Sequence, residues 1–133
     1  MSAASSRKQR QAMTATETFD YRGTLERLGG DTGLFAELVR FFLEDTGEIL
    51  QRAHEGAREK DAHKLSRAAH SLKGLCSTFG GREAVDLAWR IEQNAMLGEL
   101  DEAPVDELEA AVTRLSEALK RRLETDGRGA DGG

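Results

Sequence analysis

Apolar residues recur at helical spacing along most of this chain. The longest such pattern begins at a capping residue, Asp31 or Thr32, and continues to about residue 57. Its apolar positions follow an i, i+3, i+4 rule and predict one long core helix. They are Leu34, Phe35, Leu38, Val39, Phe42, Ile49 and Ala53. A shorter pattern at residues 20–28 precedes it and ends at a Gly-Gly pair, the usual sign of a helix end.

Three further helical patterns follow. One runs from an N-cap at Asp61 to about Phe79, and the next covers about residues 82–97. The last covers about residues 104–123, with Pro104 in its first turn. Short links join the four long helices, which predicts an all-α fold, an antiparallel up-down-up-down four-helix bundle. We expect the short N-terminal helix to pack over one end of it.

The two ends of the chain lack apolar periodicity. Residues 1–18 are rich in Ser, Ala, Thr, Gln and Arg and are predicted to be a disordered arm or a linker. Residues 124–133 are rich in Gly and Asp and are predicted to be a flexible tail. The folded domain is therefore expected at residues 19–123.

Composition narrows the classes of function. The chain has 133 residues, room for one domain, and its net charge of −5 comes from interspersed acids and bases, so nucleic acid is not expected as a partner. No apolar run approaches the ~18 residues needed to span a bilayer. The N-terminus also lacks the apolar segment of a secretory signal. Cys76, the single cysteine, excludes an internal disulfide. A cytoplasmic monomer is expected.

One histidine of the helix predicted at residues 61–79 falls on its polar face. At about 100° per residue, every residue within about 60° of His70 is polar or small. These neighbours are His63, Ser66, Arg67, Lys73, Gly74 and Ser77. The apolar residues lie on the opposite side, namely Leu65, Ala68, Leu72, Leu75, Cys76 and Phe79. His70 should therefore face solvent, either as a surface residue without a role or as a reactive one.

A carboxylate of the helix predicted at residues 82–97 changes the balance between those two interpretations. Glu92 falls inside the apolar arc of its helix, where an unpaired charge would cost several kcal/mol. Its partner could be an Arg or Lys at the boundary of the core, or an imidazole on the adjacent antiparallel helix. In the second case the carboxylate would accept from Nδ1–H of His70 and leave Nε2 free as a nucleophile.

Two neighbours of His70 suggest what it would attack. Lys73, one turn on, places an ammonium near groups added to Nε2, which suits a phosphoryl group, although a solvated surface lysine is the alternative. Gly74 costs about 1 kcal/mol in a helix relative to Ala. Because it points away from the apolar stripe, it indicates that another surface approaches closely rather than that two helices pack there. Ser77 adds a second small residue to the same face.

The string "AAHSLKGLCSTFGG" at residues 68–81, followed by "WRIEQ", resembles the histidine-containing phosphotransfer (HPt) domains of phosphorelays. The upstream string "LERLGGDTGLFAELVRFFLED" resembles the start of the same family, so the resemblance covers about residues 19–123. The matching positions are Ala69, His70, Leu72, Lys73, Gly74, Gly80 and Glu92. Cys76 departs from the family's small residues but falls on the core side.

The resemblance implies a four-helix bundle whose histidine carries a phosphoryl group between aspartates of receiver domains. His70 would be the phosphorylated residue, Lys73 would contact the phosphoryl group, and Glu92 would orient the imidazole. Clearance for the docking receiver would come from Gly74, Ser77, Arg67 and Ser66. No cofactor of the chain's own is expected, since the receiver would supply Mg²⁺ during transfer.

Other interpretations remain open at this stage. An ATP-using enzyme is disfavoured because the sequence has no P-loop or kinase signature. A metal site shared by His63 and His70 is excluded, because they lie about 10.5 Å apart along a helix, so no metal site is expected. The chain could also be the HPt fragment of a hybrid or chemotaxis-type histidine kinase, or a docking module that is not phosphorylated.

Overall fold

A computed structural model describes residues 18–132, with side chains for residues 18–126. The helices are α2 (Tyr21–Arg27), α3 (Thr32–Arg58), α4 (Ala62–Thr78), α5 (Arg82–Met96) and α6 (Ala103–Gly132). The described residues contain no strand. The predicted arm at residues 1–18 falls almost wholly outside the described part of the chain.

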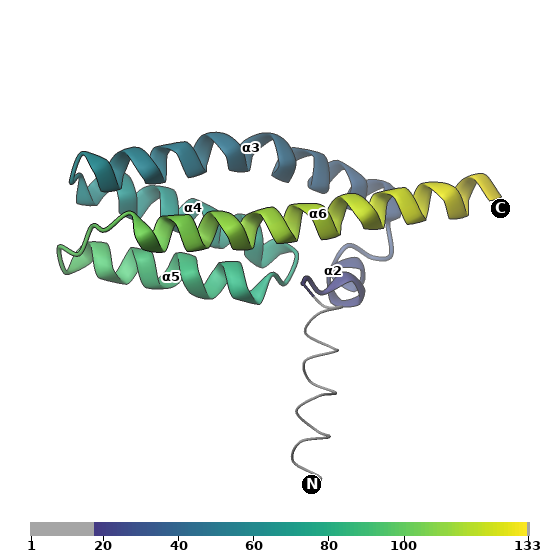
Figure 1. Cartoon of the computed structure of the whole chain (residues 1–133). Helices are drawn as coiled ribbons and strands as arrows, with labels where there is room; N and C mark the ends of the chain where they lie inside the picture. Colours follow the sequence, from purple (N-terminus) through teal and green to yellow (C-terminus); the bar gives the residue numbers. More distant parts are fainter. Residues whose placement is uncertain (1–17, 133) are drawn as a thin grey trace, which may run out of the picture.

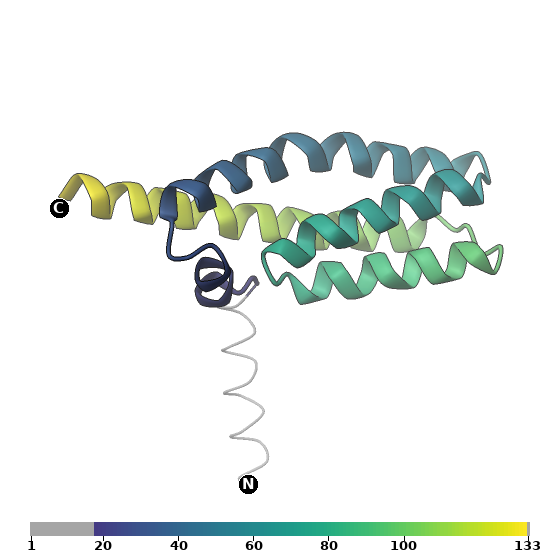
Figure 2. The same cartoon turned by 180° about the vertical axis from the view of Figure 1, so that it is seen from behind.

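The four long helices form the predicted bundle. Helix α4 packs against α3 and α5, and α6 closes the ring by contacting both α3 and α5 (Figures 1 and 2). Successive helices run in opposite directions because each connection is short, as the sequence predicted. The all-α fold and the up-down-up-down order are thus confirmed.

The predicted helix starts have a direct physical cause. Asp31 and Asp61 each accept a hydrogen bond from the backbone N–H three residues on, Leu34 and Lys64 respectively, and so satisfy an otherwise unpaired donor. Gly80 ends the α4 segment with φ 65°, a left-handed conformation that favours glycine. This sharp end lets α5 turn back along α4.

Helix α2 lies at the end of the bundle where α4 turns into α5 (Figure 1). The backbone N–H of Asp20 donates to the carbonyl of Phe79 over 2.8 Å, and Arg27 donates to the carbonyl of Thr78. An aromatic cluster fills the core beneath it, with adjacent ring centroids 5.2–6.3 Å apart. Its members are Phe19, Tyr21, Phe35, Phe42 and Phe79. The expectation that the short helix covers one end is confirmed.

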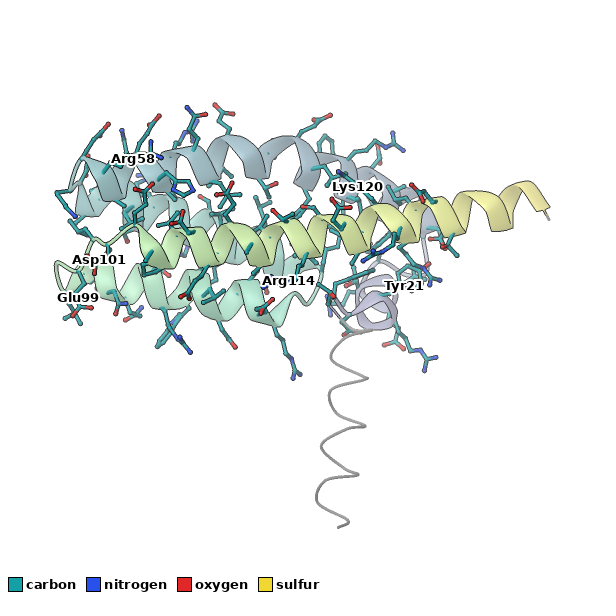
Figure 3. The ribbon with its side chains drawn as sticks, in the orientation of Figure 1. Tyr21, Arg58, Glu99, Asp101, Arg114 and Lys120 are labelled. Atoms are coloured by element: carbon teal, nitrogen blue, oxygen red, sulfur yellow. The ribbon has the colours of Figure 1, made fainter. Side chains whose placement is uncertain are left out.

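The last helix is longer than the sequence predicted. Helix α6 continues to Gly132, so the expected helix end near residue 123 was too early. Tertiary contacts explain part of the extension. The Tyr21 hydroxyl donates to Asp126 over 3.1 Å, and the guanidinium of Arg122 lies 3.8 Å from the centre of the Tyr21 ring. Figure 3 shows Tyr21 where α2 lies next to α6. These contacts tie the extension of α6 to α2.

Most of the predicted core is buried, with a few departures at its edges. Phe35, Val39, Phe42 and Ala53 are fully buried, whereas Leu34 is 37% exposed and Leu38 and Ile49 are half-buried. Leu75 is also half-buried. None of the helices in the described part of the chain combines the length and the apolar character that a membrane span requires.

Candidate functional site

The exposed face of α4 carries His70 beside α5. The His70 side chain is 68% exposed, and its Nδ1 lies 2.9 Å from Oε2 of Glu92 on α5. Because a carboxylate only accepts, Nδ1 must carry the hydrogen, and Nε2 of a neutral ring then keeps its lone pair. Within the described residues, no side chain or backbone group bonds to Nε2. Nε2 is therefore left open on a side chain that is mostly exposed.

Glu92 has two partners rather than one. Its other oxygen, Oε1, accepts from Nζ of Lys73 over 2.7 Å. The two interpretations of this carboxylate from the sequence, a boundary ion pair and an imidazole hydrogen bond, are therefore both present. The ion pair with Lys73 was missed in the sequence, although Lys73 lies on the His70 face of α4. The Glu92 side chain is 16% exposed and that of Lys73 is 28% exposed, so their ion pair is partly shielded from solvent, whereas the imidazole of His70 is not.

The contacts of Glu92 also set its protonation. The hydrogen bond from Lys73 is the largest cause that lowers the pKa of Glu92, and the bond from His70 lowers it further against the opposing effect of burial. The carboxylate is thus ionised at neutral pH, and it can hold the imidazole by Nδ1–H without taking its proton.

The remaining predicted residues lie around His70 on the same face of α4. A Cβ atom at Gly74 would have no heavy atom within 4 Å, other than its own helix backbone and chain neighbours. Ser77 and Arg67 are exposed and Ser66 is half-buried. Cys76 points into the core, where burial raises the pKa of its thiol to about 12, so it stays a protonated, inert residue.

Exposed apolar side chains lie on the helices that flank α4. On α3, Leu34, Leu38 and Phe41 share the helical phase of Gly56, whose backbone lies against Leu65 of α4. They therefore border the α4 side of α3, and Phe41 is 55% exposed. The apolar spacing predicted Leu34 and Leu38 as core positions and did not include Phe41, because period alone does not show where the buried arc ends.

Two exposed apolar residues of α5 were also not predicted. Trp89 is 51% exposed and Met96 is 73% exposed, and they lie three residues before and four residues after Glu92. Residues at this spacing share a helix face, so both flank the carboxylate that holds His70.

Comparison with known proteins decides the family. A sequence model described as the Hpt domain matches residues 37–118 of this chain. This protein belongs to the Hpt domain family. Hpt domains act in histidine phosphotransfer in phosphorelays, and they interact with receiver domains of two-component systems.

Two solved structures share the fold of this Hpt domain. Histidine-containing phosphotransfer protein B (HptB) from Pseudomonas aeruginosa PAO1 superposes with a TM-score of 0.75 at 23% identity, over 82% of this chain and 96% of that one. The HPT domain from the Hpt sensor hybrid histidine kinase from Shewanella gives 0.70 at 19% identity, over 83% and 97%. No curated protein sequence matches the chain.

The ion pair of Glu92 predicts a pH dependence of stability. Because folding lowers the pKa of Glu92, the ionised carboxylate stabilises the fold fully above the ordinary glutamate range and loses that effect as pH falls through the lowered value. Glu92→Gln should therefore lose less of its free energy of unfolding than the parent between neutral pH and about pH 3. Urea unfolding at several pH values measures this.

A second variant tests the cause. Lys73→Met should flatten the same acid dependence, because the Lys73 hydrogen bond is the largest cause of the lowered pKa. Parallel pH profiles for the parent and Glu92→Gln would show that this carboxylate does not couple folding to protonation.

Proposed function

We propose that the chain is a phosphorelay intermediate that accepts a phosphoryl group on His70 from a receiver-domain aspartate and passes it to another receiver-domain aspartate. The observation that carries this proposal is that one nitrogen of the imidazole is hydrogen-bonded while the ring itself is open to solvent. Nδ1 is held by Glu92 over 2.9 Å, while the side chain as a whole is 68% exposed. A nucleophile needs this combination of a fixed orientation and an open approach.

The transfer step follows from the protonation of the ring. The Nε2 lone pair of His70 attacks the phosphorus of the aspartyl phosphate, an N–P bond forms, and the bond from phosphorus to the aspartate oxygen breaks. The aspartate leaves as a carboxylate. The ring keeps its Nδ1 proton and becomes positively charged, and the adjacent Glu92 carboxylate stabilises that charge. Onward transfer is the reverse reaction with a second receiver.

Lys73 has a supporting role in this proposal. Its ammonium has three donors, of which one reaches Oε1 of Glu92, so others are free to bind phosphoryl oxygens. In the unphosphorylated chain the Glu92 contact holds the amine one turn from His70. The lysine would then move only slightly when the phosphoryl group arrives.

The receiver would dock over the α4 face. Gly74, Ser77, Arg67 and Ser66 would provide clearance around His70, and the apolar residues Leu34 and Phe41 of α3 would extend the contact area toward the C-terminal end of α4. The receiver's own acidic pocket would bring the Mg²⁺ needed for transfer. The chain would need no nucleotide and no cofactor for this step.

The test compares two phosphoryl sources. A receiver domain carrying a radiolabelled aspartyl phosphate should transfer its label to this chain in the presence of Mg²⁺. ATP and Mg²⁺ alone should leave the chain unlabelled. Labelling by purified ATP would contradict the proposal, and so would failure to accept label from every receiver domain encoded in the same genome.

A further inference from the structure

A second histidine lies between α3 and the start of α6, away from the α4–α5 face. The side chain of His54 is only 13% exposed, and carboxylates face both of its ring nitrogens. Nδ1 lies 2.9 Å from Oε2 of Glu102, and Nε2 lies 2.9 Å from Oε1 of Glu109. The phosphotransfer proposal gives this cluster no role.

The two contacts of His54 cannot both be ordinary hydrogen bonds of a neutral ring. A neutral imidazole has one N–H, and ionised carboxylates only accept, so one of the two short contacts needs an additional positive charge. A proton or a metal ion could supply it.

The charges around the ring favour more than a single proton. Asp106 adds a third carboxylate, 3.8 Å from Nδ1. Arg58 is the one cation paired with these carboxylates within the described residues, through Nε and Glu102 at 3.0 Å. Figure 3 shows Arg58 at the end of the bundle where Asp101 leads into α6. Three negative charges against one positive leave −2 beside a neutral ring and −1 beside a protonated one, so a divalent cation can balance the cluster where a single proton cannot.

The side chains are also close enough to share one ion. His54, Asp106 and Glu109 each offer a ligand atom, and these atoms lie within 4.8 Å of one another. Asp106 and Glu109 are three residues apart on α6 and so share a face. They are 68% and 52% exposed, so small rotations can bring their oxygens to the ~2.0–2.2 Å that zinc requires.

We propose that His54, Asp106 and Glu109 bind a divalent transition-metal ion of the zinc class. His54 would coordinate through Nε2, which Glu109 faces, and donate Nδ1–H to Glu102, the arrangement that fixes the ring of most metal-bound histidines. The exposed side chain of Asp106, whose Oδ1 lies 3.8 Å from Nδ1, would rotate toward the ion. One imidazole and two carboxylates leave the fourth tetrahedral position to water. The ion would fasten the first turns of α6 to α3.

The choice of zinc over magnesium follows from the ligands. Imidazole nitrogen suits zinc, copper and nickel, whereas magnesium prefers an all-oxygen shell and releases its water reluctantly. The metal site that we considered from the sequence paired His63 with His70. His54 was not among the candidate metal ligands, because its carboxylate partners lie 48 to 55 residues further along the chain.

Calorimetry on the full, metal-stripped chain tests the site. Titration with ZnCl₂ near pH 7.5 in a non-coordinating buffer should show saturable binding of about one ion per chain, and the ion should raise the melting temperature. His54→Gln and Glu109→Gln should each weaken binding at least about tenfold, and Glu102→Gln should weaken it about tenfold through the outer contact. MgCl₂ at the same concentration should give no saturable signal.

His63→Gln is the matched control, because His63 is an exposed histidine of α4 outside this cluster, and it should bind zinc like the parent. No saturable zinc binding would overturn the proposal, as would binding that Glu109→Gln leaves unchanged. Equal affinity for magnesium would overturn the zinc-class assignment. Should His54→Gln fail to fold, Glu109→Gln decides, since its exposed side chain is not part of the core. None of these measurements depends on phosphoryl transfer.

Discussion

His70→Gln should accept no phosphoryl group from a phosphorylated receiver, a loss to background rather than a reduction. The glutamine amide can still hydrogen-bond to Glu92, so the surface stays polar and the bundle stays folded. Its nitrogen, however, has no free lone pair comparable to that of Nε2, so no N–P bond can form. Transfer of radiolabel from the receiver, followed over time, measures the effect.

The other two histidines provide the controls for that experiment. His63 lies two turns before His70 on the same face of α4, and His54 lies on α3 between carboxylates. His63→Gln and His54→Gln should both accept label at the parental rate. The label on the parent should be lost in acid and kept in alkali, as expected of a phosphoramidate. If His70→Gln accepted label while either control lost it, the assignment of the acceptor would be wrong.

Gly74→Gln should slow transfer on the order of 100-fold while making the bundle slightly more stable. A side chain at this position would project from the surface beside His70, where the receiver must approach, and small misplacements of reacting groups can cost about that factor. Replacement of glycine inside an exposed helix raises stability by up to about 1 kcal/mol. Transfer kinetics and a thermal melt by circular dichroism are measured on the same preparation.

The chain offers a matched glycine for this test. Gly47 lies inside α3, where a Cβ atom would also meet open space, and it borders the hollow beside His54 rather than the α4 face. Gly47→Gln in metal-free buffer should show the same small gain in stability with parental transfer. Equal loss of transfer in both variants, or a loss that follows unfolding of Gly74→Gln, would contradict the clearance role of Gly74.

The sequence alone determined the four-helix bundle and the exposed position of His70. Helical period is a local property, so the spacing of apolar residues placed four helices and showed that His70 is opposite the stripe that contains Leu65 and Leu72. Asp31 and Asp61 were recognisable as caps because a capping side chain bonds only three residues ahead.

Tertiary structure decided which partners meet. Periodicity placed Glu92 on the core side of its helix, but only the register of α5 against α4 shows that its two oxygens reach His70 and Lys73 at once. Register depends on the geometry of the turn and on packing along the whole interface, which no local pattern contains. The meeting of His54 with Glu109, 55 residues later in the chain, has the same origin.

The end of α6 and the exposure of residues at the edge of the core could also be learned only from the tertiary structure. The glycines after residue 126 disfavour helix by intrinsic propensity, yet α6 continues through them, and Tyr21 of α2 contacts Asp126 where the extension begins. Phe41 and Trp89 have the residue types of a core but remain half exposed, because burial depends on which neighbouring helix covers a position. The sequence specifies where each side chain points on its own helix, and the assembled bundle determines what that side chain meets.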